Sequence, residues 1–159
     1  MKGLRKIQLS VVLGCSLFFT SSYVVYAAEN ADTCGGLSPT IIGTEGNDII
    51  NGTEGPDVIL ALGGNDVIDG NGGDDVICAG DGDDVVDGGS GNDTIYGGAG
   101  DDSLLGSDGN DFIDGGDGND IIDSALGVDT VDGGDGLDVC DAGGDSEGDT
   151  IVNCETSSQ

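Results

Sequence analysis

The residues best suited to chemistry in this sequence are aspartates that recur every nine positions. Eleven such aspartates follow one another without an insertion. They are Asp48, Asp57, Asp66, Asp75, Asp84, Asp93, Asp102, Asp111, Asp120, Asp129 and Asp138. Carboxylate oxygens are the ligands that hard cations prefer. The spacing therefore predicts a repeated series of cation-binding positions.

The composition of the chain removes most other kinds of chemistry. Its 159 residues include 32 acidic side chains, three basic ones and no His. The sequence thus has no imidazole to act as a base or to bind zinc, and no Gly-rich loop ending in Lys-Ser/Thr to hold a phosphate. A net charge of −29 also argues against nucleic acids and anionic membranes as partners. We expect no enzyme activity and name no protein partner.

The first 28 residues have the pattern of a secretory signal peptide. The chain's basic residues are Lys2, Arg5 and Lys6. An apolar stretch, Val11–Phe19, follows them, and we expect cleavage near Ala27 or Ala28. A membrane anchor and lipid attachment at Cys15 are the alternatives. Cleavage predicts a secreted, extracellular chain that has lost every positive side chain and has no membrane span.

Each nine-residue unit predicts a turn followed by a very short strand. A Gly stands two residues before each aspartate, and an apolar residue stands two residues after it. The apolar positions are Ile50, Ile59, Ile68, Ile77, Val86, Ile95, Leu104, Ile113, Ile122, Val131 and Cys140. One apolar residue per unit makes a core only if units stack. Because one unit is too short to close a coil, we expect two nonapeptides per turn and two facing sheets.

Two units carry a resemblance to a known family. Gly88–Tyr96 and Gly115–Asp123 match the pattern G-G-x-G-x-D-x-U-x of the hemolysin-type, or RTX, calcium-binding repeats. The resemblance implies an all-β protein with a parallel β-roll solenoid at residues 43–141. It also implies Ca²⁺ ions held between loops by backbone carbonyls and the motif aspartates.

The resemblance further implies that each ion is shared by aspartates eighteen residues apart, from the Asp48/Asp66 pair to the Asp120/Asp138 pair. Eleven loops give nine such pairs, of which we expect about six to eight to bind calcium. The unit that begins with Ser124-Ala125-Leu126 departs most from the motif.

Four cysteines remain after signal cleavage, and they fit an oxidising compartment: Cys34, Cys78, Cys140 and Cys154. Three pairings are possible. We favour Cys34 with Cys78 and Cys140 with Cys154, because each bond ties a flanking segment to the nearby end of the repeats. Residues 29–42 would then be an N-terminal segment tied to the roll, and residues 142–159 a C-terminal cap and tail.

Two functions remain after these exclusions. The first is a secreted calcium-binding protein whose folding depends on the ion. The second is a structural or adhesive component of the cell surface or extracellular matrix that uses the roll as a calcium-rigidified spacer. Neither reading assigns a toxin or enzyme activity to the chain.

Overall fold

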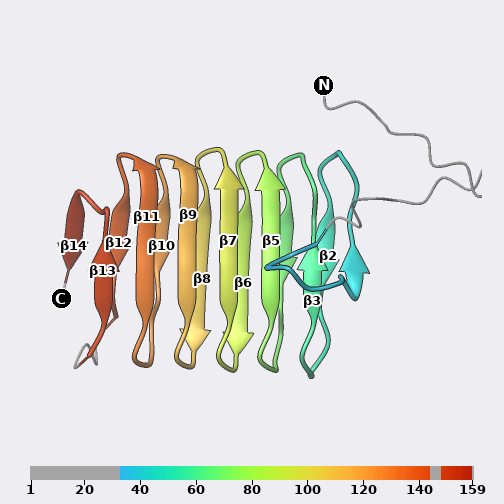
Figure 1. Cartoon of the computed structure of the whole chain (residues 1–159), viewed down its shortest axis with the longest axis horizontal. Helices are drawn as coiled ribbons and strands as arrows, with labels where there is room; N and C mark the ends of the chain where they lie inside the picture. The colour runs from blue at the N-terminus through green and yellow to red at the C-terminus, as the bar shows by residue number, and fades with distance from the viewer. Residues whose placement is uncertain (1–32, 144–147, 159) are drawn as a thin grey trace, which may run out of the picture. The chain divides into compact units, whose positions relative to one another are not determined.

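The computed structural model describes residues 33–143 and 148–158, which contain strands and no helix. Two parallel sheets of seven strands each face one another (Figure 1). One sheet contains β1 (Ile41–Ile42), β3 (Val58–Leu60), β5 (Val76–Asp81), β7 (Thr94–Ala99), β9 (Phe112–Gly118), β11 (Thr130–Gly136) and β13 (Thr150–Val152). The other contains β2 (Ile49–Asn51), β4 (Val67–Asp69), β6 (Val85–Ser90), β8 (Ser103–Asp108), β10 (Ile121–Asp123), β12 (Val139–Asp141) and β14 (Thr156–Ser158).

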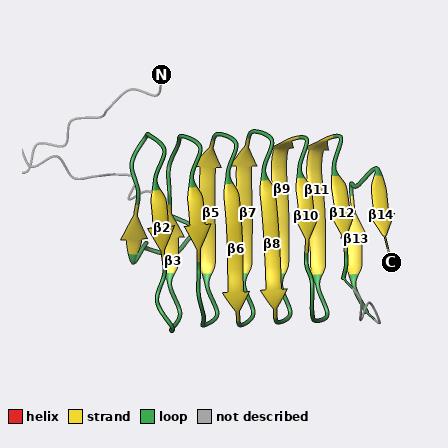
Figure 2. Ribbon diagram, turned by 180° about the vertical axis from the view of Figure 1, so that it is seen from behind, coloured by secondary structure: helices red, strands yellow, loops and turns green. Residues whose placement is uncertain are grey.

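The strand register follows the sequence period. Ile59 pairs with Ile77, and Ile77 pairs with Ile95, so stacked partners in the repeats lie eighteen residues apart. Consecutive strands alternate between the two sheets, as the view from behind also shows (Figure 2). The prediction of a parallel β-roll with two nonapeptides per turn is confirmed.

The core is a double row of single apolar side chains. Along β7, Ile95 is fully buried, whereas Thr94 and Tyr96 on either side of it face outward and are partly exposed. Each of the eleven apolar positions of the period is buried in the same way. Burying one aliphatic side chain stabilises the fold by about 1.5–3 kcal/mol, so the core depends on stacking many units.

Strand pairing continues beyond the nonapeptides at both ends. Ile41 of β1 pairs with Ile59, Ile151 of β13 pairs with Val131, and β14 pairs with β12. Ile41 and Ile151 also pack against the core. The flanking segments therefore contribute strands as well as disulfides.

The two predicted disulfides are present. Cys34 is bonded to Cys78 on β5, with their Cα atoms 5.6 Å apart, and Cys140 is bonded to Cys154, with a Cα separation of 6.0 Å. The first bond holds the N-terminal segment against the outer face of the odd-numbered sheet, where Gly35 approaches Tyr96. Tyr96 in turn packs against a second aromatic ring, that of Phe112, at a centroid distance of 6.1 Å.

The signal peptide predicted at residues 1–28, including Cys15, lies outside the described residues. In the part of the chain that the structure describes, no helix is long and apolar enough to cross a membrane.

Candidate metal-binding site

The loops between strands owe their shape to glycines at fixed positions. The second loop residue has a positive φ in most units, as in Gly98 (φ +116°) and Gly116 (φ +102°). The fourth is also glycine, as in Gly100 (φ +134°), where a Cβ atom would overlap the carbonyl oxygen of Gly82 in the neighbouring turn. Glycine therefore allows the backbones of successive turns to approach closely.

The motif aspartates form a hydrogen-bonded ladder along each edge of the roll. The backbone N–H of Asp84 donates to Oδ1 of Asp102 at 2.8 Å, and the N–H of Asp102 donates to Oδ1 of Asp120 at 2.9 Å. The same bond joins all nine predicted pairs, at 2.7–2.9 Å. The structure thus brings together each pair of aspartates that the period predicted.

The second carboxylate oxygen of most motif aspartates has no hydrogen-bond partner among the described residues. From Asp66 to Asp138 the nine motif side chains are at most 3% exposed. Their unpartnered buried atoms are Oδ2 of Asp66, Asp75, Asp84, Asp93, Asp102, Asp111, Asp120, Asp129 and Asp138. A buried carboxylate oxygen without a partner is costly, so each one indicates a place for a cation.

A backbone carbonyl lies near six of these oxygens, those of Asp75, Asp93, Asp102, Asp111, Asp120 and Asp138. An ideal Cβ atom on Gly97 would be 2.5 Å from Oδ2 of Asp102 and 2.5 Å from the carbonyl oxygen of Gly115. The same two kinds of oxygen flank the first glycine of other loops, such as Gly70 and Gly106. Carboxylate and carbonyl oxygens beside glycine are a donor set that fits calcium.

Burial changes the ionisation of the ladder. It raises the pKa of Asp102 to about 7 and the pKa of Asp75, Asp84 and Asp111 to about 6. Desolvation is the main cause in all four cases, and neighbouring carboxylates add to it. When no cation is bound, these buried aspartates are therefore protonated at a higher pH than exposed aspartates are.

The described residues contain no group of three or more acidic, Cys or His side chains arranged to hold a metal ion. The loops instead bring carboxylates from two turns close to backbone carbonyl oxygens.

The first two loops differ from the rest. In the loop Gly52–Asp57, the backbone N–H of Thr53 donates to Oδ2 of Asp57 at 2.8 Å, and the Thr53 hydroxyl donates to the same atom at 2.9 Å. Thr44 makes the equivalent pair of bonds to Oδ2 of Asp48. In these two loops, Thr44 and Thr53 therefore donate to the Oδ2 atom that has no hydrogen-bond partner among the described residues in the other nine loops.

The most divergent unit keeps the loop backbone. Ala125 adopts a positive φ (+67°), as Leu62, Asn71, Ser107 and the glycines at this loop position do. Asp129 is buried, and its Oδ2 atom has no hydrogen-bond partner among the described residues. Ser124 replaces the first glycine, and its hydroxyl is buried without a hydrogen-bond partner among the described residues. The departure from the motif therefore changes the lining of this loop and preserves its shape.

A second ladder, which the sequence analysis missed, runs along the loop residues that precede the motif aspartates. The N–H of Asn119 donates to Oδ1 of Asp101 at 2.8 Å, and the N–H of Asn110 donates to Oδ1 of Asn92 at 3.0 Å. The bond to Asn119 lowers the pKa of Asp101. The signal was present in the sequence, since Asn or Asp fills this position in eight of the eleven units.

A parallel two-sheet solenoid with buried aspartates stacked beside backbone carbonyls defines the class of calcium-binding β-rolls. The family model of the RTX calcium-binding nonapeptide repeat matches this chain in four copies, at residues 42–77, 79–113, 96–131 and 114–146. The chain belongs to this family of calcium-binding repeats. No curated protein matches it.

Proposed function

We propose that this protein is a secreted calcium-binding protein without catalytic activity, in which calcium drives folding of the β-roll. The observation that carries the proposal is the row of buried, unpartnered Oδ2 atoms along both edges. Calcium would supply the positive charge that these oxygens lack. The two disulfides support an extracellular location, because such bonds persist in oxidising compartments.

We assign the eleven motif aspartates as the ligand-bearing residues, with each ion between aspartates eighteen residues apart. Asp48 and Asp57 are the least available, because Thr44 and Thr53 already bond their Oδ2 atoms. Setting aside the two pairs that include them leaves seven of the nine pairs. This number agrees with the expectation of about six to eight ions.

The test is a calcium titration of the protein with both disulfides formed, followed by circular dichroism and light scattering. In calcium-free buffer the chain is expected to be expanded, since its carboxylates repel one another and its core is thin. Calcium should produce a compact, strand-rich state, whereas equal magnesium should not, because magnesium demands tighter octahedral geometry. A compact strand-rich state that persists without calcium would overturn the proposal.

One observation favours the second function, a surface or matrix spacer. The even-numbered sheet exposes aliphatic side chains on its outer face in a row that Ser103 interrupts: Ile49, Val67 and Val85 on one side of it, and Ile121 and Val139 on the other. A row of this kind suits contact with another surface. Self-association in the light-scattering titration at saturating calcium would support the spacer function, and a strictly monomeric roll would argue against self-assembly.

A further inference from the structure

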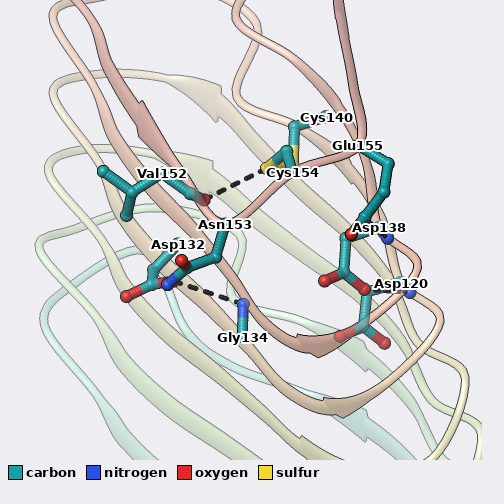
Figure 3. Close-up of a disulfide and its surroundings, with 9 residues drawn as sticks. All are labelled: Asp120, Asp132, Gly134, Asp138, Cys140, Val152, Asn153, Cys154 and Glu155. Atoms are coloured by element: carbon teal, nitrogen blue, oxygen red, sulfur yellow. Dashed lines mark hydrogen bonds between the residues drawn. A yellow bond between two sulfur atoms is a disulfide. The ribbon is translucent and has the colours of Figure 1, made fainter.

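The aspartate ladder on one edge of the roll does not end at the last motif aspartate. The backbone N–H of Asp138 donates to Oε2 of Glu155 at 2.5 Å, just as Asp120 donates to Oδ1 of Asp138 at 2.9 Å (Figure 3). Glu155 lies seventeen residues beyond Asp138 and outside the matched repeats. Glu155 therefore takes the place of a further motif aspartate, and its longer side chain fits the altered spacing.

Asp138 itself presents the feature that marks the other positions. Its side chain is fully buried, and its Oδ2 atom has no hydrogen-bond partner among the described residues. An ideal Cβ atom on Gly133 would lie 2.8 Å from this oxygen and would also contact the carbonyl oxygen of Asn153. Asn153 thus provides the carbonyl that Gly115 provides beside Asp102.

Contacts on both sides of Asn153 fix the position of its carbonyl group. Asn153 has a positive φ (+53°), and its side-chain amide donates to Oδ1 of Asp132 at 2.7 Å. Asp132 also accepts the N–H of Gly134 at 3.2 Å. The next residue, Cys154, is bonded to Cys140 on β12. The disulfide therefore lies between the two groups, Asn153 and Glu155, that complete the arrangement around Asp138 (Figure 3).

We propose that Asp138, Glu155 and the carbonyl of Asn153 form an additional calcium position at the C-terminal end of the roll, secured by the Cys140–Cys154 disulfide. The inference rests on the proposed calcium-binding function. It adds one ion to those held between motif aspartates and assigns the C-terminal disulfide a role in retaining that ion.

The test compares two Glu-to-Gln variants with the wild-type protein. Glu155→Gln removes the charge but keeps an oxygen that accepts the N–H of Asp138, so the ladder bond is preserved. Glu54→Gln makes the same change at an exposed residue in the second loop, at the opposite end of the roll. Bound calcium per chain is measured by equilibrium dialysis and elemental analysis after circular dichroism has verified folding.

Glu155→Gln is expected to bind one ion fewer than the wild type, and Glu54→Gln the same number as the wild type. Equal stoichiometry in all three proteins would overturn the additional position and leave the proposed function intact. A wild-type chain that binds no calcium would instead overturn the proposed function.

A measurement on the wild type keeps the inference testable if Glu155→Gln fails to fold. In the calcium-saturated protein, carbodiimide-driven amidation should modify Glu155 much more slowly than Glu54, as followed by peptide mass spectrometry, although both side chains are exposed. Similar rates at the two residues would contradict calcium binding by Glu155.

The disulfide is tested by replacing both of its cysteines. Cys140→Ala with Cys154→Ala should lose the same single ion, whereas Cys34→Ala with Cys78→Ala should not lose it. Retention of the ion without the C-terminal disulfide would refute the role assigned to that bond.

Discussion

Asp120 accepts the backbone N–H of Asp102 on Oδ1 at 2.9 Å, while its Oδ2 atom is buried without a hydrogen-bond partner in the part of the chain that the structure describes. One oxygen thus fixes the register of two turns, and the other is available to an ion. The same division recurs along both edges of the roll. Stacking and cation binding therefore depend on the same carboxylates, which predicts that calcium binding and folding are one cooperative process.

Asp120→Asn should raise the calcium concentration at the folding midpoint by about twofold, because a loss of roughly 3 kcal/mol is spread over several ions that bind cooperatively with folding. Asparagine keeps an oxygen for the Asp102 N–H but removes the charge from two positions, those shared with Asp102 and with Asp138. The midpoint is measured by circular dichroism during a calcium titration.

The matched control is Asp117→Asn, three residues away in the same loop. Asp117 is exposed, whereas Asp120 is 1% exposed, so the control makes the same charge change at a solvated position. Its midpoint should stay near that of the wild type. Equal shifts for both variants would mean that charge density alone, and not the motif position, controls folding.

Gly100→Ala should destabilise the calcium-saturated roll by about 3 kcal/mol or more. Gly100 has a φ of +134°, and an added Cβ would overlap the carbonyl oxygen of Gly82. Gly55→Ala is the control, because its Cβ would meet nothing within 4 Å. Urea denaturation at saturating calcium compares the two, and comparable losses would contradict the close approach of successive turns.

The repeat geometry could be predicted from the sequence because two constraints coincide. An uninterrupted period of nine fixes which residues stack, and one apolar residue per unit forces the units to share a core. Once Ile77 must lie above Ile59, the pairing of Asp57 with Asp75 follows without knowledge of the loops. The disulfides followed from the same register, since it placed Cys78 within reach of Cys34.

The ends of the roll could not be predicted in this way. Glu155 follows Asp138 by seventeen residues and Asp149 follows Asp129 by twenty, so neither lies in the period, although each accepts the N–H of its predecessor. The role of Thr53 was hidden for a different reason. A residue other than glycine at the second loop position departs from the motif and suggests a weakened unit, whereas the backbone N–H and the hydroxyl of Thr53 both donate to Oδ2 of Asp57.

Thr53→Val should lower the stability of the roll by about 1 kcal/mol, the net value of a typical hydrogen bond. The variant keeps the backbone donor to Asp57 and removes only the hydroxyl bond of 2.9 Å. Since the Thr53 bonds lower the pKa of Asp57, that pKa should also rise toward its ordinary value.

The control for this substitution is Thr94→Val, on an outward position of β7 where a β-branched residue suits a strand. Stability is measured by urea denaturation at saturating calcium, and the pKa of Asp57 by carboxyl NMR. A loss of stability in Thr94→Val as large as that in Thr53→Val would contradict a specific contribution of the hydroxyl bond from Thr53 to Asp57.

Acid should promote folding of the roll when calcium is absent. Burial raises the pKa of Asp102 to about 7 and that of Asp75, Asp84 and Asp111 to about 6, against an ordinary value of 3.8. The folded state therefore binds protons more tightly than the unfolded state. The contribution of these four groups to stability is fully present below about pH 4 and is lost as the pH rises through 6 to 7.

Asp57 and Asp101 act in the opposite direction, because a lowered pKa gives stability that is lost as the pH falls through the folded-state value. These two groups oppose seven with raised pKa values, so the net effect should favour the folded state in acid. Circular dichroism of resin-treated, calcium-free protein should show strand content increasing from pH 7.5 toward pH 4.5, with light scattering to separate folding from aggregation. Soluble chelators are avoided because they bind protons themselves in this range. Strand content that falls or stays flat as acid is added would show that the buried aspartates do not oppose folding, and that calcium acts on the roll by some route other than neutralising them.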